Sequence, residues 1–383
     1  MKSIDPSGIH IVSFDVPYPF DYGGVIDVYH RCKALKEIGV RVILHCYEYG
    51  RGKQPNLLEV ADEVYYYARE KNPFLLLSPI PFIVRSRASG LLLKNLAKNQ
   101  YPILFEGIHT CYFLGNNVLK KRWVGVRAHN VEHDYYNELA KIEPNWKKRL
   151  FFKLEAFKLA QFERQFKFAD ELLSVTPKDN DYFQKKYQKG VYIPVFNPLN
   201  WGEVERGTGD YVLFHGNLSV MENENAVRYI LTEIWDKKWS FKLIIAGKEP
   251  SKSFVSWLAE QGTFVSCIAN PSNEKLNQLI REAKINLLPT FQNTGIKHKL
   301  LNALANGGYC LANTTMVEGT GLEDFCHIAN TPEEWRKNIL ELIQTPNNQS
   351  VFDERTARLH AIFDLKTNAK LIMQLASKHL TQD

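Results

Sequence analysis

The sequence predicts an α/β protein with two Rossmann-like, doubly wound parallel-sheet domains and a cleft between them. Short apolar strand patterns alternate with helical patterns along most of the chain, which is typical of parallel sheets covered by helices on both faces. The length of 383 residues favours two domains, at roughly 150 residues each. A stretch rich in Pro, Gly and Asn, residues 194–209, separates the two sets of strands.

The first set opens with a βαβ pattern. Residues 9–16 and 40–47 are predicted strands, and between them lie a Pro/Gly-rich loop and a helix over about 25–38 that Gly39 ends. The other strands are short apolar runs at 63–67, 103–105, 124–127, 171–175 and 191–193. We expect residues 1–195 to form the first domain, with a helix at about 364–383 packing back on it.

The second set repeats this alternation. Its predicted strands are residues 211–215, 241–245, 263–265, 285–288 and 309–312, and its helices are 224–235, 253–260, 272–283, 295–306 and the segment from 332 onward. We expect residues 196–363 to form the second domain. Loops at the carboxyl ends of two such sheets converge, so a ligand site is expected in the cleft.

Composition excludes several protein classes. The share of charged residues, 23%, and of hydrophobic residues, 45%, does not fit a disordered or collagen-like chain. The six cysteines are scattered, which favours reduced thiols over a disulfide scaffold or a zinc site. Residues 74–84 are the most lipid-like stretch, but they are too short for a span of roughly 20 apolar residues. The polar start does not fit a signal peptide, so we expect a cytoplasmic protein.

Charge is unevenly distributed along the chain. Residues 1–195 carry 29 Lys and Arg against 21 Asp and Glu, a net charge of +8, whereas the remainder carries −2. A basic half suits an anionic partner such as nucleic acid, an acidic membrane surface or a pyrophosphate-linked acceptor. An ordinary solvated surface is an equally good interpretation.

Residues 285–319 form the most informative segment: an apolar strand, a loop, a helix that begins near Gly295 and a second strand. Helix N-termini carry partial positive charge and unpaired N–H donors, so an anion could be held beside Gly295 and Ile296. Lys297 and Lys299 would add charge. The segment therefore predicts a site for a phosphorylated ligand, most simply a diphosphate.

Other candidate ligand contacts follow strands. Gly23 and Gly24 lie where a strand turns into a helix, and Gly216 with Asn217 follows an apolar strand, so the backbone there could approach a phosphate or sugar closely. Lys248 follows a strand and a glycine. The alternatives are a simple tight turn for the glycines and a solvated side chain for the lysine.

Two histidines are the candidate catalytic groups. His109 and His129 each follow a predicted strand, at the sheet edge that faces the expected cleft, where an imidazole could bond a sugar hydroxyl or stabilise a leaving phosphate. Structural histidines are the alternative. Glu132 could orient the ring or the acceptor, although Glu132 and Asp134 could equally serve in the first turn of a helix. Glu106 is a further carboxylate candidate.

Several segments, in this order and spacing, resemble one family across nearly the whole chain. They are Pro19-Phe20-Asp21-Tyr22-Gly23-Gly24, Ala128-His129-Asn130-Val131-Glu132, Phe168-Ala169-Asp170, Phe214-His215-Gly216-Asn217-Leu218, Ile245-Ala246-Gly247-Lys248 and the run from Lys299 to Gly307. The family is the GT-B glycosyltransferases, in particular the retaining, family-4-like group (glycosyl transferases group 1) of the bacterial surface-glycan type.

The resemblance implies a function. A hexose would pass from a nucleotide-diphosphate sugar to a glycan or lipid-linked acceptor with retention of configuration. The first domain would bind the acceptor and the second the donor, and neither a metal ion nor a cofactor other than the donor substrate would be needed.

The chain departs from the family pattern in two places. Relatives carry a pair of glutamates around the donor helix, where this chain has Thr294 and Asn302, and a basic pair after the Gly216 motif, where it has residues 220–223, Val-Met-Glu-Asn. An uncharged Asn302 can still form hydrogen bonds to a ribose. These departures keep two alternatives open: a catalytically silent relative that binds sugar nucleotides or glycans, and a GT-B nucleotide-sugar epimerase. The sugar, base, acceptor, linkage and oligomeric state are not predicted.

Asp179-Asn180-Asp181 has the form of an Asp-x-Asp metal motif. It follows Pro177, so we interpret it as the acidic first turn of a helix instead.

Residues 144–168 form a basic, aromatic helix. We expect a core-facing stripe made of Leu150, Leu154, Phe157 and Phe168, and a surplus of aromatic residues made of Phe151, Phe152, Phe162 and Phe166. The surplus and the basic residues suit docking on an anionic membrane, which would make the protein peripheral on the inner face. An ordinary packed helix is the alternative. Nucleic-acid binding is not expected, because no known module is present.

Overall fold

The computed structural model describes residues 7–199, 205–292 and 295–379. The chain divides into two compact units, Met1–Pro198 with Phe363–Asp383, and Leu199–Ile362. The boundaries predicted from the sequence were 195/196 and 363/364. The first boundary in the structure, between Pro198 and Leu199, lies inside the stretch 194–209 that was interpreted as the linker.

The first unit is built on a seven-stranded sheet in the order β3-β2-β1-β4-β5-β6-β7, and all its neighbouring strands are parallel. The inner strands β1 and β4 are buried along their whole length because helices cover both faces. The strands are β1 (Gly8–Ser13), β2 (Arg41–Glu48), β3 (Glu63–Ala68), β4 (Ile103–Glu106), β5 (Val124–Ala128), β6 (Glu171–Ser174) and β7 (Gly190–Tyr192).

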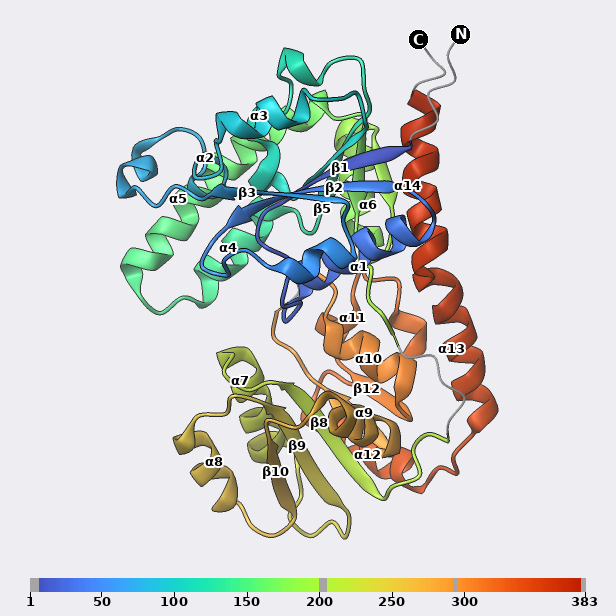
Figure 1. The fold of residues 1–383 in the computed structure, drawn as a ribbon. Coiled ribbons are helices and arrows are strands. Elements are labelled where there is room, and N and C mark those ends of the chain that lie inside the picture. Colours follow the sequence, from blue (N-terminus) through green and yellow to red (C-terminus); the bar gives the residue numbers. More distant parts are fainter. Residues whose placement is uncertain (1–6, 200–204, 293–294, 380–383) are drawn as a thin grey trace. The chain divides into compact units, whose positions relative to one another are not determined.

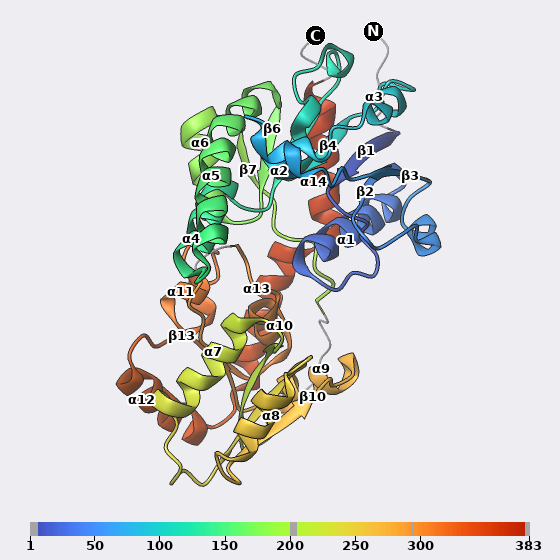
Figure 2. The ribbon, with the colours of Figure 1, turned by 90° about the vertical axis from the view of Figure 1, so that its left-hand side faces the viewer.

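Helices cover this sheet in two layers, as Figures 1 and 2 show. On one face lie α1 (Gly23–Glu37) and α14 (Leu365–His379), whose Ala369 and Ile372 share a core with Val28 and Leu35 of α1. The turn η1 (Pro55–Glu59) packs on the same face as α1 and α14, through Leu57. The other face and its edges carry α2 (Phe82–Arg85), α3 (Gly90–Leu96), α4 (Glu132–Ile142), α5 (Trp146–Phe162), α6 (Pro177–Tyr187) and the short turns η2 (Pro73–Leu77), η3 (Ile108–Phe113), η4 (Asn117–Leu119) and η5 (Glu163–Phe168).

The second unit has a six-stranded parallel sheet in the order β10-β9-β8-β11-β12-β13. Its strands are β8 (Tyr211–Asn217), β9 (Lys242–Lys248), β10 (Val265–Ala269), β11 (Ile285–Leu288), β12 (Tyr309–Ala312) and β13 (His327–Ile328). Its helices are α7 (Met221–Tyr229) with the π-turn η6 (Ile230–Ile234), α8 (Lys252–Ala259), α9 (Asn273–Glu282), α10 (His298–Asn306), α11 (Thr314–Val317), η7 (Glu323–Phe325), α12 (Pro332–Gln344) and α13 (Gln349–Phe363).

The expected fold class is therefore confirmed: two parallel-sheet units, each layered with helices. The sequence missed β13, because two half-exposed residues give no strand pattern. None of the helices in the described residues combines the length and the apolarity that a membrane crossing requires.

The orientation expected for residues 144–168 is wrong. Leu150, Leu154, Phe157 and Phe168 are exposed, whereas Ala156, Leu159 and Phe166 are buried and Phe152 and Phe162 are half-buried. Helix α5 is apolar on several sides, so its hydrophobic pattern does not select a face. Buried Glu155 determines which face of α5 is turned inward. Its Oε2 accepts the Phe82 N–H at 2.6 Å, which fixes that side of α5 against the start of α2.

The Asp-x-Asp segment lies in the first turn of α6, as interpreted from the sequence. Thr176 is the N-cap residue, and its hydroxyl accepts the Asp179 N–H at 3.1 Å. Asp179 is therefore an acidic residue at a helix N-terminus, where the helix dipole favours a carboxylate.

Candidate active site

In the second unit, polar side chains gather where β8 and β11 end and α10 begins. The Lys299 Nζ donates to Asn223 Oδ1 at 2.8 Å and lies 5.1 Å from the centre of the Phe214 ring. Burial lowers the pKa of Lys299 to about 8, although the Glu222 carboxylate opposes this shift. Lys299 is thus a half-buried cation held by neutral groups at the carboxyl edge of the sheet, with Glu222 as the nearby opposite charge.

Lys297 lies beside Lys299. Its Nζ donates to the Gln292 carbonyl at 2.8 Å, and burial lowers its pKa, again against the influence of Glu222. Two ammonium groups that have lost part of their hydration lie at one helix start. Such a pair favours an anionic ligand, because a phosphate would replace the lost hydration with charge-assisted hydrogen bonds.

Helix α10 begins at His298, so the expected start near Gly295 is wrong. Gly295 has a φ of +61° and Lys297 is extended, with φ −94° and ψ 123°, so residues 295–297 cannot form a helical turn. The N-terminal end of the helix dipole therefore lies at His298 and Lys299, not at Gly295 and Ile296. Thr294 lies outside the described residues.

The segment that replaces the family's basic pair supplies partners for these lysines. Asn223 accepts the hydrogen bond from Lys299, and the Glu222 carboxylate accepts one from the Thr290 hydroxyl. Asn313 holds the Thr290 backbone through a donated bond of 2.7 Å and an accepted bond of 3.2 Å. Neither Glu222 nor Thr290 was predicted from the sequence to belong to the site. An acidic residue in place of a basic pair was the signal that could have found Glu222.

Two of the other predicted donor contacts, Gly216 and Asn217, have local structural roles. Gly216 pairs with Gly247 in the β8–β9 ladder, and a Cβ added to Gly247 would lie 2.0 Å from the Gly216 oxygen. Asn217 closes the turn into α7, because its Oδ1 accepts the Ser219 N–H at 3.0 Å. Lys248 is exposed at the end of β9, and Asn302 is half-buried within α10. Ligand contact by these residues stays a prediction.

In the first unit, both histidines lie at the carboxyl ends of their strands and share one aromatic neighbour. The Phe14 ring is 5.4 Å from the ring of His109 and 5.6 Å from that of His129. Gly23 and Gly24 are the first residues of α1, and a Cβ on Gly24 would lie 2.6 Å from Phe14 Cζ. The small Gly24 therefore makes room for the ring that packs against the two imidazoles.

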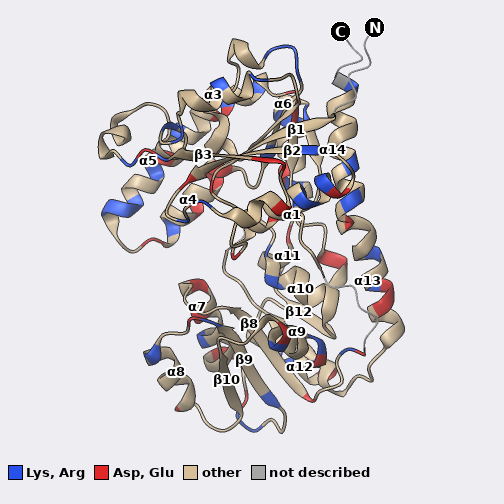
Figure 3. Ribbon diagram, viewed as in Figure 1, with Lys and Arg blue, Asp and Glu red and all other residues tan. Residues whose placement is uncertain are grey.

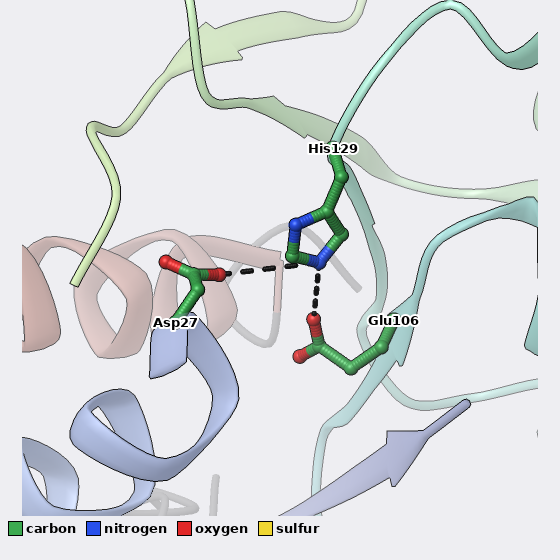
Figure 4. A group of neighbouring side chains, drawn as sticks. All are labelled: Asp27, Glu106 and His129. Atoms are coloured by element: carbon green, nitrogen blue, oxygen red, sulfur yellow. Dashed lines mark hydrogen bonds and ion pairs between the residues drawn. The ribbon is translucent and has the colours of Figure 1, made fainter. Parts of the chain in front are cut away.

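His129 lies between two buried carboxylates (Figure 4). Its Nε2 is 3.1 Å from Glu106 Oε2 and 4.0 Å from Asp27 Oδ2. Glu106 is fully buried and also pairs with Arg31. The imidazole is thereby held in one orientation at the edge of the sheet.

Asp27 joins this histidine to a larger ion-pair network. Its carboxylate binds Arg31 at 2.5 Å and Arg127 at 3.0 Å, and it accepts the Phe196 N–H at 2.7 Å. Burial alone would raise the pKa of Asp27, but Arg127 and Arg31 outweigh it and hold the pKa well below its usual range. Arg127 also donates to the carbonyls of Ile193 and Pro194, at 2.5 and 2.9 Å.

The trio of Asp27, Glu106 and His129 has the ligand types and spacing of a metal site. The charges argue against that role. Two fully buried guanidinium groups, of Arg31 and Arg127, already pair with the two carboxylates, so a divalent cation would add uncompensated positive charge. We interpret the trio as part of the ion-pair network. The sequence analysis missed Asp27, Arg31 and Arg127, because the contact joins residues far apart in the chain.

His109 is a neutral hydrogen-bonding group. Burial, followed by the charge of Arg87, holds its pKa well below the usual value. Its Nδ1 is buried and has no hydrogen-bond partner among the described residues. Gly107, with a φ of +64°, allows the ring to lie against the backbone, since a Cβ there would be 2.7 Å from Nδ1.

Glu132 is the first residue of α4, so both of its predicted roles remain open. Burial raises the pKa of Glu132 to about 7. A hydrogen bond from the Asn130 side chain opposes this shift, and the nearby Asp179 carboxylate adds to it. Burial therefore favours the neutral, protonated form of this carboxyl group. Asp134 lies in the same first turn and is 3.6 Å from His133.

Comparison with known proteins agrees with this geometry. Residues 209–345 match the family described as Glycosyl transferases group 1. An uncharacterized 44.6 kDa protein in the cps region of Klebsiella pneumoniae is 27% identical over 353 residues, which cover 87% of this chain and 90% of that one.

Two solved structures share the fold over nearly the whole chain. Anabaena Alr3699/HepE in complex with UDP has a TM-score of 0.63 at 12% identity, covering 97% of this chain and 99% of that one. The lipopolysaccharide outer core galactosyltransferase WaaB has a TM-score of 0.62 at 15% identity, covering 95% and 99%.

The chain has the GT-B fold, and residues 209–345 of its second unit match the group 1 glycosyl transferases. The match covers β8 to α12 and so includes the lysine pair, Lys297 and Lys299. The histidines and the ion-pair network of the first unit lie outside the matched residues, so any role for them in ligand binding or catalysis is argued from geometry alone.

Proposed function

We propose that this protein is a glycosyltransferase that moves a hexose from a nucleotide-diphosphate sugar to a glycan or lipid-linked acceptor, with retention of configuration and without a metal ion. The bond between the anomeric carbon and the diphosphate oxygen breaks, and the acceptor hydroxyl oxygen forms the new bond. The acceptor proton is released, so the products are the glycoside, the nucleoside diphosphate and a proton. The relative in a cps region favours polysaccharide biosynthesis as the setting.

The observation that carries this proposal is the lysine pair at the start of α10. Lys297 and Lys299 offer two partly desolvated ammonium groups beside the positive end of a helix dipole. Negative charge develops on the diphosphate as the sugar leaves, and fixed positive charge there lowers the barrier. The same cations would make a divalent metal ion dispensable, so EDTA should leave the rate unchanged.

His129 is our candidate for the group next to the transferred sugar. Glu106 orients its ring, so one imidazole nitrogen is fixed in place while the other is available to a hydroxyl or a phosphate oxygen. His109, held neutral, is suited to hydrogen bonding of a sugar hydroxyl and not to charge neutralisation. We propose that the first unit binds the acceptor and that the second unit binds the donor.

Nucleotide binding tests the core of this proposal. A panel of nucleoside diphosphates and their hexose conjugates is added to the protein, and the melting temperature is measured. Ligands that carry one particular base should raise the melting temperature, because a ligand that binds the folded state stabilises that state. The gain should be lost in Lys299→Met and kept in Lys33→Met, a change of an exposed lysine on α1. If no nucleotide stabilises the wild type and no donor is hydrolysed, the proposal is wrong.

A silent binding relative is the second candidate, favoured by Asn302. In the family a glutamate stands at that position, and the uncharged amide of Asn302 removes a charged contact to the donor. This candidate predicts nucleotide stabilisation without any transfer or hydrolysis of the bound sugar. Turnover that falls in His129→Ala excludes it.

A further inference from the structure

The exposed sides of α5 and η2 form an unusually apolar surface on the first unit. Four side chains dominate it: Leu77 is 83% exposed, Phe74 75%, Trp146 67% and Phe157 66%. Leu150 and Leu154 of α5 are also exposed and complete what we call the α5–η2 surface. Large aromatic and aliphatic residues gathered in one place indicate a binding surface, whereas scattered ones do not.

This surface is held rigidly. At about 100° per residue, positions 146, 150, 154 and 157 of α5 fall on one stripe, opposite the buried residues Ala156 and Leu159. The Lys158 Nζ donates to the Leu76 carbonyl at 2.7 Å and to Glu155 at 3.1 Å, which ties η2 to α5. The apolar side chains therefore project from two joined elements whose inner faces are fixed in the core.

Basic residues flank the stripe. By the same helical spacing, Arg149 and Lys153 lie along one side and Lys147 and Lys158 along the other. Figure 3 shows Lys and Arg, in blue, on α5. The one acidic residue in the sequence of α5, Glu155, is buried. Glu155 pairs with Lys158, and α5 has no further acidic residue to offset Lys147, Arg149 and Lys153. The surface thus combines apolar side chains with positive charge.

We propose that the α5–η2 surface docks on an anionic lipid bilayer. Aromatic and leucine side chains would enter the boundary between headgroups and acyl chains, while the flanking lysines and arginine would pair with lipid phosphates. A protein partner fits less well, because protein interfaces are depleted in lysine. Docking does not depend on the proposed transfer reaction, although it would bring the enzyme to lipid-linked acceptors.

Vesicle binding of the full-length protein tests the proposal. The probes are vesicles of phosphatidylethanolamine with phosphatidylglycerol, and vesicles of phosphatidylcholine alone. We expect sedimentation with the anionic vesicles, little with the neutral ones, and release by salt because ionic screening weakens the lysine contacts. The double variant Leu77→Ser/Phe157→Ser and the double variant Lys147→Glu/Lys153→Glu should each lower binding about tenfold or more.

Matched controls lie on the opposite face of the same sheet. Leu58 is 59% exposed in η1 and Lys33 is exposed on α1, so Leu58→Ser and Lys33→Glu should bind vesicles as the wild type does. All variants change exposed residues, and their thermal unfolding should match that of the wild type.

Three results would overturn the proposal: equal binding to neutral vesicles, wild-type binding by both double variants, or a concentration-dependent dimer that Leu77→Ser/Phe157→Ser abolishes. The last result would assign the surface to a second copy of the chain. Nucleotide stabilisation without vesicle binding would leave the transferase proposal intact and reject only the docking.

Discussion

Lys299 is the residue whose charge state links the geometry of the second unit to ligand binding. Its pKa is lowered to about 8 by burial, and Glu222 limits the shift. A diphosphate beside the ammonium group would favour the protonated form, so the pKa of Lys299 rises on binding and a proton is taken up. Affinity should therefore be constant at lower pH and should weaken as the pH rises through about 8.

We predict that the Kd for the preferred nucleoside diphosphate rises up to about tenfold per pH unit above that value. Isothermal titration calorimetry in buffers of different ionisation enthalpy would measure both the Kd and the proton uptake. Lys299→Met should bind more weakly throughout and should lose most of the pH dependence. A wild-type Kd that stays constant from about pH 7 to about pH 9.5 would contradict this account.

Glu222 is an acidic group at a site proposed for an anion. Its carboxylate accepts a hydrogen bond from Thr290. It also opposes the lowering of the pKa values of Lys297 and Lys299 by burial. Glu222→Gln keeps the shape and removes one negative charge, so we predict a several-fold tighter Kd for the nucleoside diphosphate, about 0.5–1 kcal/mol. Glu224→Gln, two residues further along α7 and therefore on the other side of the helix, is the matched control and should change the Kd little. Weaker binding in Glu222→Gln would instead mean that Glu222 contacts the ligand as an acceptor.

Glu132 gives a prediction about stability. Its folded-state pKa is about 7, against a usual value of 4.5, chiefly because of burial. The folded state therefore binds the proton more tightly, so this group's contribution to stability is complete at pH values below 4.5 and is lost as the pH rises through 7. Glu132→Gln should raise the free energy of unfolding by about 1–3 kcal/mol at pH ~8 and much less at pH ~4.5, as measured by urea unfolding at both pH values. An equal effect at both would show that the carboxyl does not titrate in this way.

At the scale of elements, apolar runs located most strands of both sheets, because buried parallel strands are continuous and hydrophobic. Boundaries failed where one residue's backbone conformation decides them. Gly295 was taken as the helix start, but its positive φ delays α10 until His298. Gly216 was placed after a strand, yet its pairing with Gly247 extends β8 to Asn217. Neither conformation can be inferred from residue type alone.

The orientation of α5 provides a test at this scale. Leu154 is exposed and Leu159 is fully buried, although both lie in the same helix. We predict that Leu159→Ala lowers the free energy of unfolding by about 2–5 kcal/mol, through lost burial and a cavity. Leu154→Ala should cost less than about 0.5 kcal/mol. Chemical denaturation of the two variants would measure both losses. A larger loss in Leu154→Ala than in Leu159→Ala would support the orientation of α5 expected from the sequence.

For the whole molecule, sequence order was sufficient to predict two doubly wound units and the lysine pair near one helix start. It was not sufficient for the first unit's charged core. Asp27 and Arg31 come from α1 and Arg127 from β5, and each looks like an ordinary surface charge in the sequence. Their burial is stable only because they meet, and that meeting depends on how the strands are ordered in the sheet.

The same charged core has a mechanical consequence. Arg127 holds the carbonyls of Ile193 and Pro194, and Asp27 holds the Phe196 N–H, so the polypeptide leaving the first unit is anchored to the groups that surround His129. A force on residues 193–196 would strain the hydrogen bonds that Asp27 and Arg127 make to this segment, and Asp27 lies 4.0 Å from the His129 ring. The segment that leaves the first unit is thus coupled to the proposed reaction centre through Asp27 and Arg127, and a displacement of residues 193–196 would alter the surroundings of His129.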